Sequence, residues 1–280
     1  MGIVTRLPLR QAGDSVYLCM MIVISILAAL LALYALWERL TGNTYHGLYF
    51  GKSKILEKGT AIPFGGNVFM NYWVVKKAQF SSKESQKNDA NLLAAFLMKW
   101  ILEGRMTVIP DGRRRVSLRP SLDTEFTDRT EMSLYEMLIA AAGKDAVLES
   151  KEFRQWARHE FEILGEYPRR AEVRGRRYLL SRGWLGENGK ATPEGMAELR
   201  KVIEFRNQLG SLTTLPREAL WKDYLVLGAL FGRLGKMDKA LKTQLPGELL
   251  LAVQAAQLMA DEGFTAAENE RLEDEQKRNQ

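Results

Sequence analysis

An unbroken run of 22 uncharged, mostly apolar residues near the N-terminus constrains this chain more than any other feature. The run extends from Val16 to Trp37. A helix rises about 1.5 Å per residue, so this run would be roughly as long as the hydrocarbon core of a bilayer is thick. Tyr17 near one end and Tyr34 near the other suit the two membrane interfaces. We therefore expect a transmembrane helix over residues 16–37, followed by a large globular part.

Two other N-terminal signals compete with a membrane anchor. The run is longer than the apolar core of a secretory signal peptide, which has about 7–15 residues. A lipoprotein signal through Cys19 would place the apolar stretch before the cysteine, whereas here it follows.

Lysines and arginines are more numerous after the run than before it, which favours a cytoplasmic C-terminal domain. The predicted localisation is the cell (inner) membrane, with a single pass and contact with the bilayer through residues 16–37.

The chain outside this run contains no cysteine and has clear helical periodicity. The fold class we predict is mainly α with short β-hairpins. It comprises one N-terminal transmembrane helix, two winged-helix-like units and a C-terminal helical bundle. The expected parts are an N-terminal tail (1–15), the transmembrane helix (16–37), a juxtamembrane segment (38–88), the first winged-helix-like unit (89–120), the second (130–192), a C-terminal helical region (193–260) and a charged tail (261–280).

The first winged-helix-like unit is predicted from a helix followed by a hairpin. Apolar residues recur at helical spacing from Ala90 to Glu103, and Gly104 then ends the helix. Strands are expected at 106–109 and 116–118, on either side of a Pro-Asp-Gly turn. The preceding segment 68–75 is aromatic and β-branched, so we expect a short extended piece there.

The second winged-helix-like unit is predicted from three helices and a short strand. The helices are expected over 132–142, from Ser150 to about 164, and from Pro168 to 182, with the strand at Trp184. Thr192 and Pro193 are typical of a helix start, as a cap and a first-turn proline. Helices over 193–209, 216–230 and 246–260 complete the C-terminal region, and the tail beyond is expected to be a fraying helix or disordered.

Several short motifs resemble a known family. They are Ile62-Pro63-Phe64-Gly65-Gly66, the helix from Leu92 to Gly104, Glu204 to Leu209, and Trp221-Lys222-Asp223-Tyr224-Leu225 with the following Gly228 to Gly232. Together they are similar to the C-terminal cytoplasmic region of a family of predicted bacterial membrane proteins that is catalogued as a domain of unknown function. The resemblance implies a bacterial protein with a cytoplasmic C-terminus and winged-helix-like folds. It supplies no catalytic residues. The exported domain of such proteins is expected to be absent here.

The net charge of +6 indicates a basic surface, which suits nucleic acid or anionic lipid. Two clusters are candidates for that contact. In the predicted hairpin they are Arg113, Arg114 and Arg115, and in the predicted helix after Pro168 they are Arg169, Arg170, Arg174, Arg176 and Arg177. A recognition helix with a basic wing would use arginines in this way. The five helix arginines do not form one stripe, so a lipid or protein contact is favoured over DNA.

No pattern in the sequence predicts a catalytic site or a metal site. The two histidines, His46 and His159, lack nearby partners for a zinc site, and no pair of carboxylates stands out for acid–base work. We expect no cofactor, no metal and no small-molecule substrate, and an enzyme built from scattered carboxylates is the least favoured reading. The function expected is a cytoplasmic binding, adaptor or regulatory scaffold module at the membrane with a protein partner. The alternative is a membrane-tethered winged-helix regulator that binds DNA.

Overall fold

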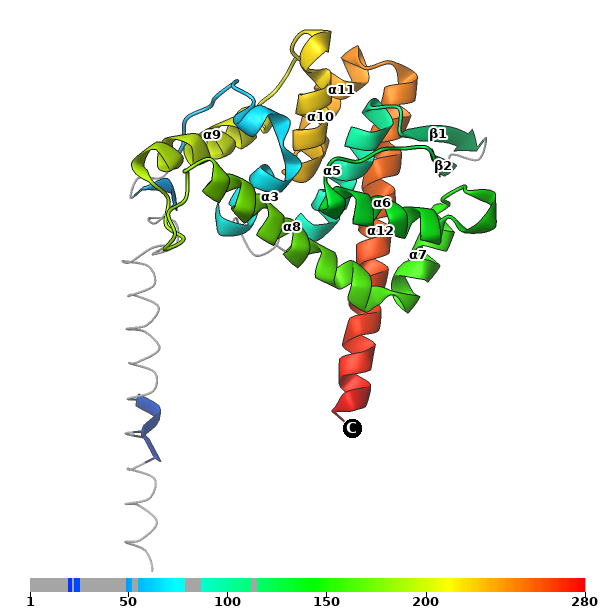
Figure 1. The fold of residues 1–280 in the computed structure, drawn as a ribbon, viewed down its shortest axis with the longest axis horizontal. Helices are drawn as coiled ribbons and strands as arrows, with labels where there is room; N and C mark the ends of the chain where they lie inside the picture. The colour runs from blue at the N-terminus through cyan, green and yellow to red at the C-terminus, as the bar shows by residue number, and fades with distance from the viewer. Residues whose placement is uncertain are drawn as a thin grey trace, which may run out of the picture. The chain divides into compact units, whose positions relative to one another are not determined.

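The computed structural model describes residues 20–21, 23–25, 49–51, 55–78, 87–111 and 115–279. The chain divides into two units, Met1–Gly47 and Leu48–Gln280, and only the second is described at length (Figure 1). Its described residues are mainly helical, with one antiparallel two-stranded sheet. The elements in chain order are η1 (Pro63–Gly66), α3 (Val68–Ala78), α5 (Asn88–Leu102), β1 (Met106–Asp111), β2 (Arg115–Pro120), α6 (Arg129–Ala141), η2 (Gly143–Asp145), α7 (Ser150–His159), α8 (Phe161–Ser181), α9 (Pro193–Leu209), η3 (Glu218–Leu220), α10 (Trp221–Leu230), α11 (Leu234–Gln244) and α12 (Gly247–Arg278).

Helix α5 is the centre of the second unit. It packs against α10 and α12 along most of its length and touches α3 and β1 as well (Figure 1). Every side chain from Leu92 to Met98 is buried, because apolar residues occupy all sides of the helix there. Trp100 ends this buried stretch and stacks on Phe96 at 5.4 Å between ring centroids. Elements from across residues 48–280 thus share one core.

The long helices α8 and α12 also pack around this core. Helix α8 packs against α3, and α12 packs against α5, α7 and α8. The α3–α8 contact is close because Gly175 faces the backbone of Phe69, with no side chain between them. The hairpin packs on α5 and α12, and Leu118 pairs with Leu148 in an isolated bridge that ties the hairpin to the start of α7.

Several sequence predictions are confirmed at the level of single elements. The helix expected over 90–103 is α5, and the two expected strands are β1 and β2, paired from Met106↔Pro120 to Asp111↔Arg115. Thr192 caps α9 by accepting the N–H of Gly195 at 3.0 Å, and Pro193 is the first helical residue. These elements are fixed by local signals, namely periodicity, a turn and a cap.

The predicted extended piece over 68–75 is wrong, because these residues form α3. Tyr72, Trp73, Val74 and Val75 are all buried, although they point in four different directions around the helix. A buried helix can satisfy its backbone internally wherever it packs, so tertiary contacts outweigh the strand preference of β-branched and aromatic residues.

The predicted helix boundary at Pro168 is also wrong. Helix α7 ends at His159, and α8 runs without interruption from Phe161 to Ser181 with Pro168 buried inside it. Proline removes one backbone hydrogen bond, and the packing of the buried ring and its neighbours offsets that loss. The charged tail 261–280, expected to be a fraying helix or disordered, is helical as far as Arg278, supported by ion pairs such as Arg271–Glu275 at 2.6 Å.

The predicted fold class and localisation need correction. Within the ranges that the structure describes, no helix combines the length and apolar character that a bilayer crossing requires. Most of the expected span, Val16–Trp37, lies outside those ranges, which include only residues 20–21 and 23–25 of it. The finding contradicts the predicted single-pass membrane architecture and the predicted membrane localisation. The corrected fold class is a mainly helical unit with one two-stranded sheet.

Candidate functional site

The exposed side of α8 carries a concentrated set of arginines. Arg169, Arg170, Arg176 and Arg177 are all exposed, and at 100° per residue they lie within about 120° of the helix surface. Val173, which is 45 % exposed, lies between the two pairs. Arg170 is bonded to Glu166 at 2.9 Å, whereas no ion pair with a described residue is found for the other three. The face formed by these five residues is called the arginine face below.

Arg174 does not belong to the arginine face. Its side chain turns toward the start of α6, where its Nε donates to the Asp128 carboxylate at 2.7 Å. Its Cζ lies over the ring of Tyr178, 4.3 Å from the ring centroid. Without Arg174, the arc of helix surface that the predicted arginines cover narrows from about 160° to about 120°. The four that remain share one side.

The two strands of the predicted wing lie away from the arginine face. Arg113 and Arg114 lie outside the described residues, and Arg115 begins β2, where its side chain is not described. The hairpin packs against α5 and α12, while α8 packs against α3 and against another part of the unit that includes α12 (Figure 1). In that view the hairpin and the C-terminal half of α8 lie on opposite sides of the unit. The arrangement of a recognition helix beside a basic wing is therefore not formed by these two elements.

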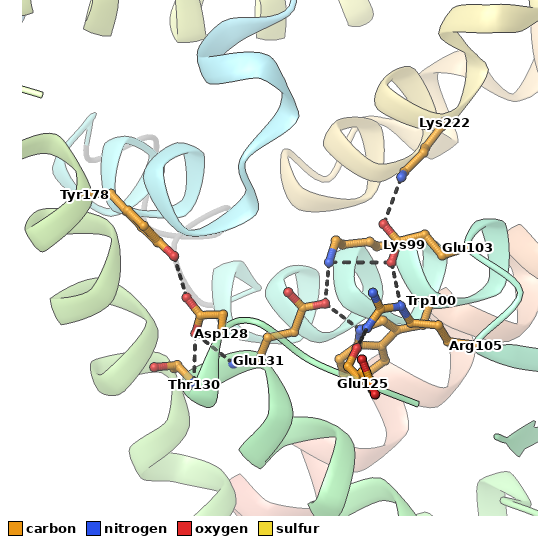
Figure 2. A network of polar contacts seen from close by, with 10 residues as sticks. All are labelled: Lys99, Trp100, Glu103, Arg105, Glu125, Asp128, Thr130, Glu131, Tyr178 and Lys222. Carbon is orange, nitrogen blue, oxygen red and sulfur yellow. Dashed lines mark hydrogen bonds and ion pairs between the residues drawn. The ribbon is translucent and has the colours of Figure 1, made fainter. Parts of the chain in front are cut away.

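Asp128 is the first of two buried carboxylates at the start of α6 (Figure 2). It caps α6 by accepting the N–H groups of Thr130 and Glu131, and it accepts the Tyr178 hydroxyl at 2.6 Å as well as Arg174. Burial raises the pKa of Asp128, but the hydrogen bonds from Tyr178, Arg174 and the two backbone groups outweigh burial, so the pKa is lowered overall. Asp128 thus connects α6 to α8 as a carboxylate.

The replacement Asp128→Asn is expected to weaken the pH dependence of stability. A carboxyl group with a lowered folded pKa contributes stability above its unfolded pKa of about 3.9, and this contribution is lost as the pH falls through the folded value. Asparagine still caps a helix, so the variant removes the charge rather than the cap. Urea unfolding at pH 7 and pH 3 should show a smaller difference for Asp128→Asn than for the wild type. The exposed Asp145→Asn is the control, and an equal pH dependence in both variants would contradict the assignment.

Glu131 is the second buried carboxylate on α6, and it joins α6 to α5 (Figure 2). One of its oxygens accepts the ammonium of Lys99 and the indole N–H of Trp100, the latter at 2.8 Å. The other oxygen has no bond to any described residue. Lys99 in turn lies 3.6 Å from Glu103. One carboxylate oxygen therefore neutralises the half-buried ammonium of Lys99 and also accepts the hydrogen bond of the fully buried indole of Trp100.

The carboxylate of Glu103 lies close to cationic side chains from three segments. Its carboxylate lies 2.8 Å from Lys222 of α10 and 3.0 Å from Arg105, in addition to Lys99 (Figure 2). Burial raises the pKa of Glu103, but the hydrogen bond from Lys222 and the charges of Lys99, Lys222 and Arg105 outweigh it, so the pKa is lowered. The ion pair to Lys222 links the α10 region to the end of α5.

A cavity of about 340 Å³ adjoins this network. It is lined by η1 and the start of α3, by Lys99 of α5, by Asp128 and Glu131 of α6, by Tyr178 of α8, and by Lys222 and Asp223 of α10. Burial raises the pKa of the Asp223 carboxyl, opposed by the charge of Lys222. Within the described residues Asp223 accepts no hydrogen bond and forms no ion pair.

The wall formed by η1 has an unusual backbone. Phe64, Gly65 and Gly66 are three consecutive residues with positive φ, at 52°, 58° and 79°. Phenylalanine rarely adopts this conformation, and such strain persists only where surrounding contacts impose it. Asn71 supplies one such contact, since its side-chain amide donates to the carbonyls of Pro63 and Asn67. The ring of Phe64 also packs on Trp184 at 5.2 Å.

Sequence reasoning found the arginines of α8 but missed the cavity. Asp223 and the Pro-Phe-Gly-Gly turn entered only as parts of short resembling motifs, with no role given. The Gly-Gly pair was the one local signal that could have drawn attention to the turn, because glycine tolerates positive φ. Nothing local indicates that this turn meets Asp223, which is more than 150 residues away in the chain.

Comparison with known proteins assigns no family to this chain. No protein-family model matches its sequence, and no curated protein and no solved structure matches it either. The resemblance to a family of bacterial membrane proteins stays a prediction.

Proposed function

We propose that this protein is a binding module that docks an acidic surface of a protein partner through the arginine face of α8. The observation that carries the proposal is the exposure of four arginines on one side of one helix, three of them without an ion pair to a described residue. Arginine is enriched at protein interfaces because its planar guanidinium can form paired hydrogen bonds with a carboxylate.

The distribution of charge along α8 supports this reading. Two arginine pairs are seven residues apart, or about 10 Å along the helix axis, and Val173 lies between them. An apolar centre with charged residues around it is the usual composition of a protein interface. A partner helix or strand with an apolar residue between two acidic positions would match this face.

Duplex DNA is the less favoured partner. A winged-helix contact needs a basic wing next to the recognition helix, and the hairpin packs elsewhere on the unit (Figure 1). In a complex with DNA, the apolar side chain of Val173 in the middle of the face would lie against phosphates, with which it can form no favourable contact. Both features favour a protein partner over DNA.

The triple replacement Arg169→Glu, Arg176→Glu and Arg177→Glu is expected to abolish binding to an acidic partner. Each of these three cations becomes an anion on the same face, so attraction to an acidic partner becomes repulsion. The measurement is fluorescence anisotropy of a labelled amphipathic peptide with glutamates on either side of a leucine, titrated with the full chain over a salt series. A loss of about tenfold or more in affinity is expected.

A matched control separates the face from total charge. Arg119, Arg129 and Arg217 are also exposed and have no ion pair to a described residue, and their replacement by glutamate changes the net charge equally. This control should bind the peptide nearly as well as the wild type does. Equal loss in both triple variants would contradict a specific face. Binding of duplex DNA in preference to the peptide, abolished by the first triple variant only, would replace the proposed partner with DNA.

A further inference from the structure

A cavity of about 390 Å³ divides the arginine face into arginines that line it and arginines that do not. The lining residues from α8 are Arg169, Glu172, Val173 and Arg176. They are spaced i, i+3, i+4 and i+7, so they form one stripe along the helix. Arg170 and Arg177 each lie about 100° further round the helix and are not part of the lining.

The opposite wall of this cavity comes from three other segments. Trp73 and Lys77 are one turn apart on α3, Tyr49 precedes them in the chain, and the turn at Asn188 and Gly189 follows α8. The ring of Tyr49 packs edge-on against Trp73, with 5.0 Å between the centroids. The cavity therefore lies beside the contact between α3 and α8, two helices that pack closely together (Figure 1).

The charges that line the cavity do not cancel. Three cationic side chains and one carboxylate line it, which leaves a net charge of +2. Lys77 donates to Glu172 at 2.6 Å, so this ion pair neutralises itself and joins α3 to α8. Arg169 and Arg176 form no hydrogen bond and no ion pair with a described residue. The net charge thus comes from two guanidinium groups whose donors are available to a ligand.

The turn at Asn188 adds a neutral donor to the lining. Gly189 donates to the carbonyl of Gly186 at 2.8 Å, and Gly186 donates to the carbonyl of Lys190 at 2.9 Å. The side-chain oxygen of Asn188 accepts the N–H of Lys190 at 3.0 Å, whereas its amide nitrogen donates to no described residue. A Cβ placed on Gly189 would be 3.6 Å from Nη2 of Arg176, so the turn lies directly beside that guanidinium.

We propose that this cavity binds the phosphate group of a phosphorylated side chain on the protein partner. A phosphate monoester carries about two negative charges at neutral pH and three acceptor oxygens, which match the net charge of the lining and its guanidinium and amide donors. Each guanidinium can form paired hydrogen bonds with a phosphate. The proposal rests on the proposed function for the partner that carries the phosphate, whereas the choice of phosphate rests on the cavity.

A carboxylate fits the same cavity less well. It has one negative charge and two oxygens, so it would satisfy one guanidinium and leave the other without a partner. Arg177 lies on the same face outside the cavity and remains available to a carboxylate of the same partner. One partner could therefore place its phosphate in the cavity and an acidic side chain beside it.

The first test titrates the full chain with phenyl phosphate by isothermal calorimetry at about pH 7.5, where the phosphate is mostly a dianion. Benzoate and phenol are the comparators. We expect phenyl phosphate to bind at millimolar concentration or below, benzoate to bind about tenfold more weakly because it has one charge fewer, and phenol not to bind. Absence of phenyl phosphate binding would overturn the proposal, and so would equal binding of phenyl phosphate and benzoate.

The second test uses two double variants that remove the same charge from the same face. Arg169→Gln with Arg176→Gln is expected to weaken phenyl phosphate binding by about tenfold or more. Arg170→Gln with Arg177→Gln removes only a screened attraction from outside the cavity, so a loss of about threefold or less is expected. Circular dichroism checks that both variants are folded. Equal losses in the two variants would contradict the assignment to the cavity.

A pair of peptides separates this proposal from the proposed function. The labelled peptide with glutamates on either side of a leucine is compared, by fluorescence anisotropy, with the same peptide in which phosphoserine replaces one glutamate. We expect the phosphopeptide to bind the full chain about tenfold or more tightly than the glutamate peptide does. That advantage should disappear in the variant that combines Arg169→Gln and Arg176→Gln.

The two proposals fail in different ways. If the glutamate peptide binds and phosphoserine brings no gain, the proposed function stands and the phosphate site is overturned. If phenyl phosphate binds and neither peptide does, the proposed function and the phosphorylated partner are both overturned, and the ligand of the cavity is then a small phosphate ester.

Discussion

Replacing Gly175 by alanine is expected to destabilise the fold by about 3 kcal/mol. The new methyl group would overlap the backbone carbonyl of Phe69 and lie 3.0 Å from Cβ of Trp73, at the point where α8 crosses α3. A backbone carbonyl inside a helix cannot turn aside as a flexible side chain can. The two helices would have to separate, and contacts along their whole interface would be lost.

The size of the effect follows from what the α3–α8 contact supports. Helix α3 carries Tyr72 and Trp73, which are among the largest fully buried side chains described. Separation of α3 from α8 would loosen both and would open space in a core that is otherwise close-packed. Urea unfolding followed by far-UV circular dichroism measures the loss as a lower midpoint.

Gly165→Ala is the matched control for this prediction. Gly165 lies in the same helix, and a Cβ placed there would meet nothing within 4 Å. Alanine favours helix over glycine by up to about 1 kcal/mol, so this variant should be slightly more stable than the wild type. If Gly175→Ala were as stable as Gly165→Ala, the close crossing of α3 and α8 would be wrong.

Removing the carboxylate of Glu131 is the second change with a large expected effect. Glu131→Ala would leave the fully buried indole N–H of Trp100 without an acceptor and the half-buried ammonium of Lys99 with only the more distant Glu103. An unsatisfied buried donor and an uncompensated charge both carry desolvation costs. We expect a loss of about 2 to 3 kcal/mol in the free energy of unfolding.

Two comparisons identify the cause. Glu131→Gln keeps an oxygen for Trp100 but loses the charge that Lys99 meets, so its loss should be smaller than that of Glu131→Ala. Glu136 lies on the same helix, is exposed and has no bond to a described residue, so Glu136→Ala should change stability little. Urea midpoints are the measurement. An equal effect at positions 131 and 136 would mean that the buried contacts in Figure 2 do not stabilise the fold.

Local signals in the sequence were sufficient for some elements and misleading for others. The hairpin, α5 and the start of α9 depend on a turn, on periodicity and on a cap, all of which act within a few residues. Helix α3 and the uninterrupted α8 contradict their local signals, strand preference in one and an internal proline in the other. In both cases burial against distant elements outweighs the local preference.

For the candidate sites, too, some features follow from the sequence and others only from the tertiary structure. The sequence determined that arginines are concentrated near positions 169–177, because composition and spacing are properties of the chain itself. Only the tertiary structure decided that Arg174 turns inward to Asp128 and leaves four arginines on one exposed face. It also brought Asp223, Glu131 and the turn at Gly66 around one cavity. These groups come from distant parts of the chain, and packing of α5, α6 and α10 brings them together in a way that no local pattern of residues encodes.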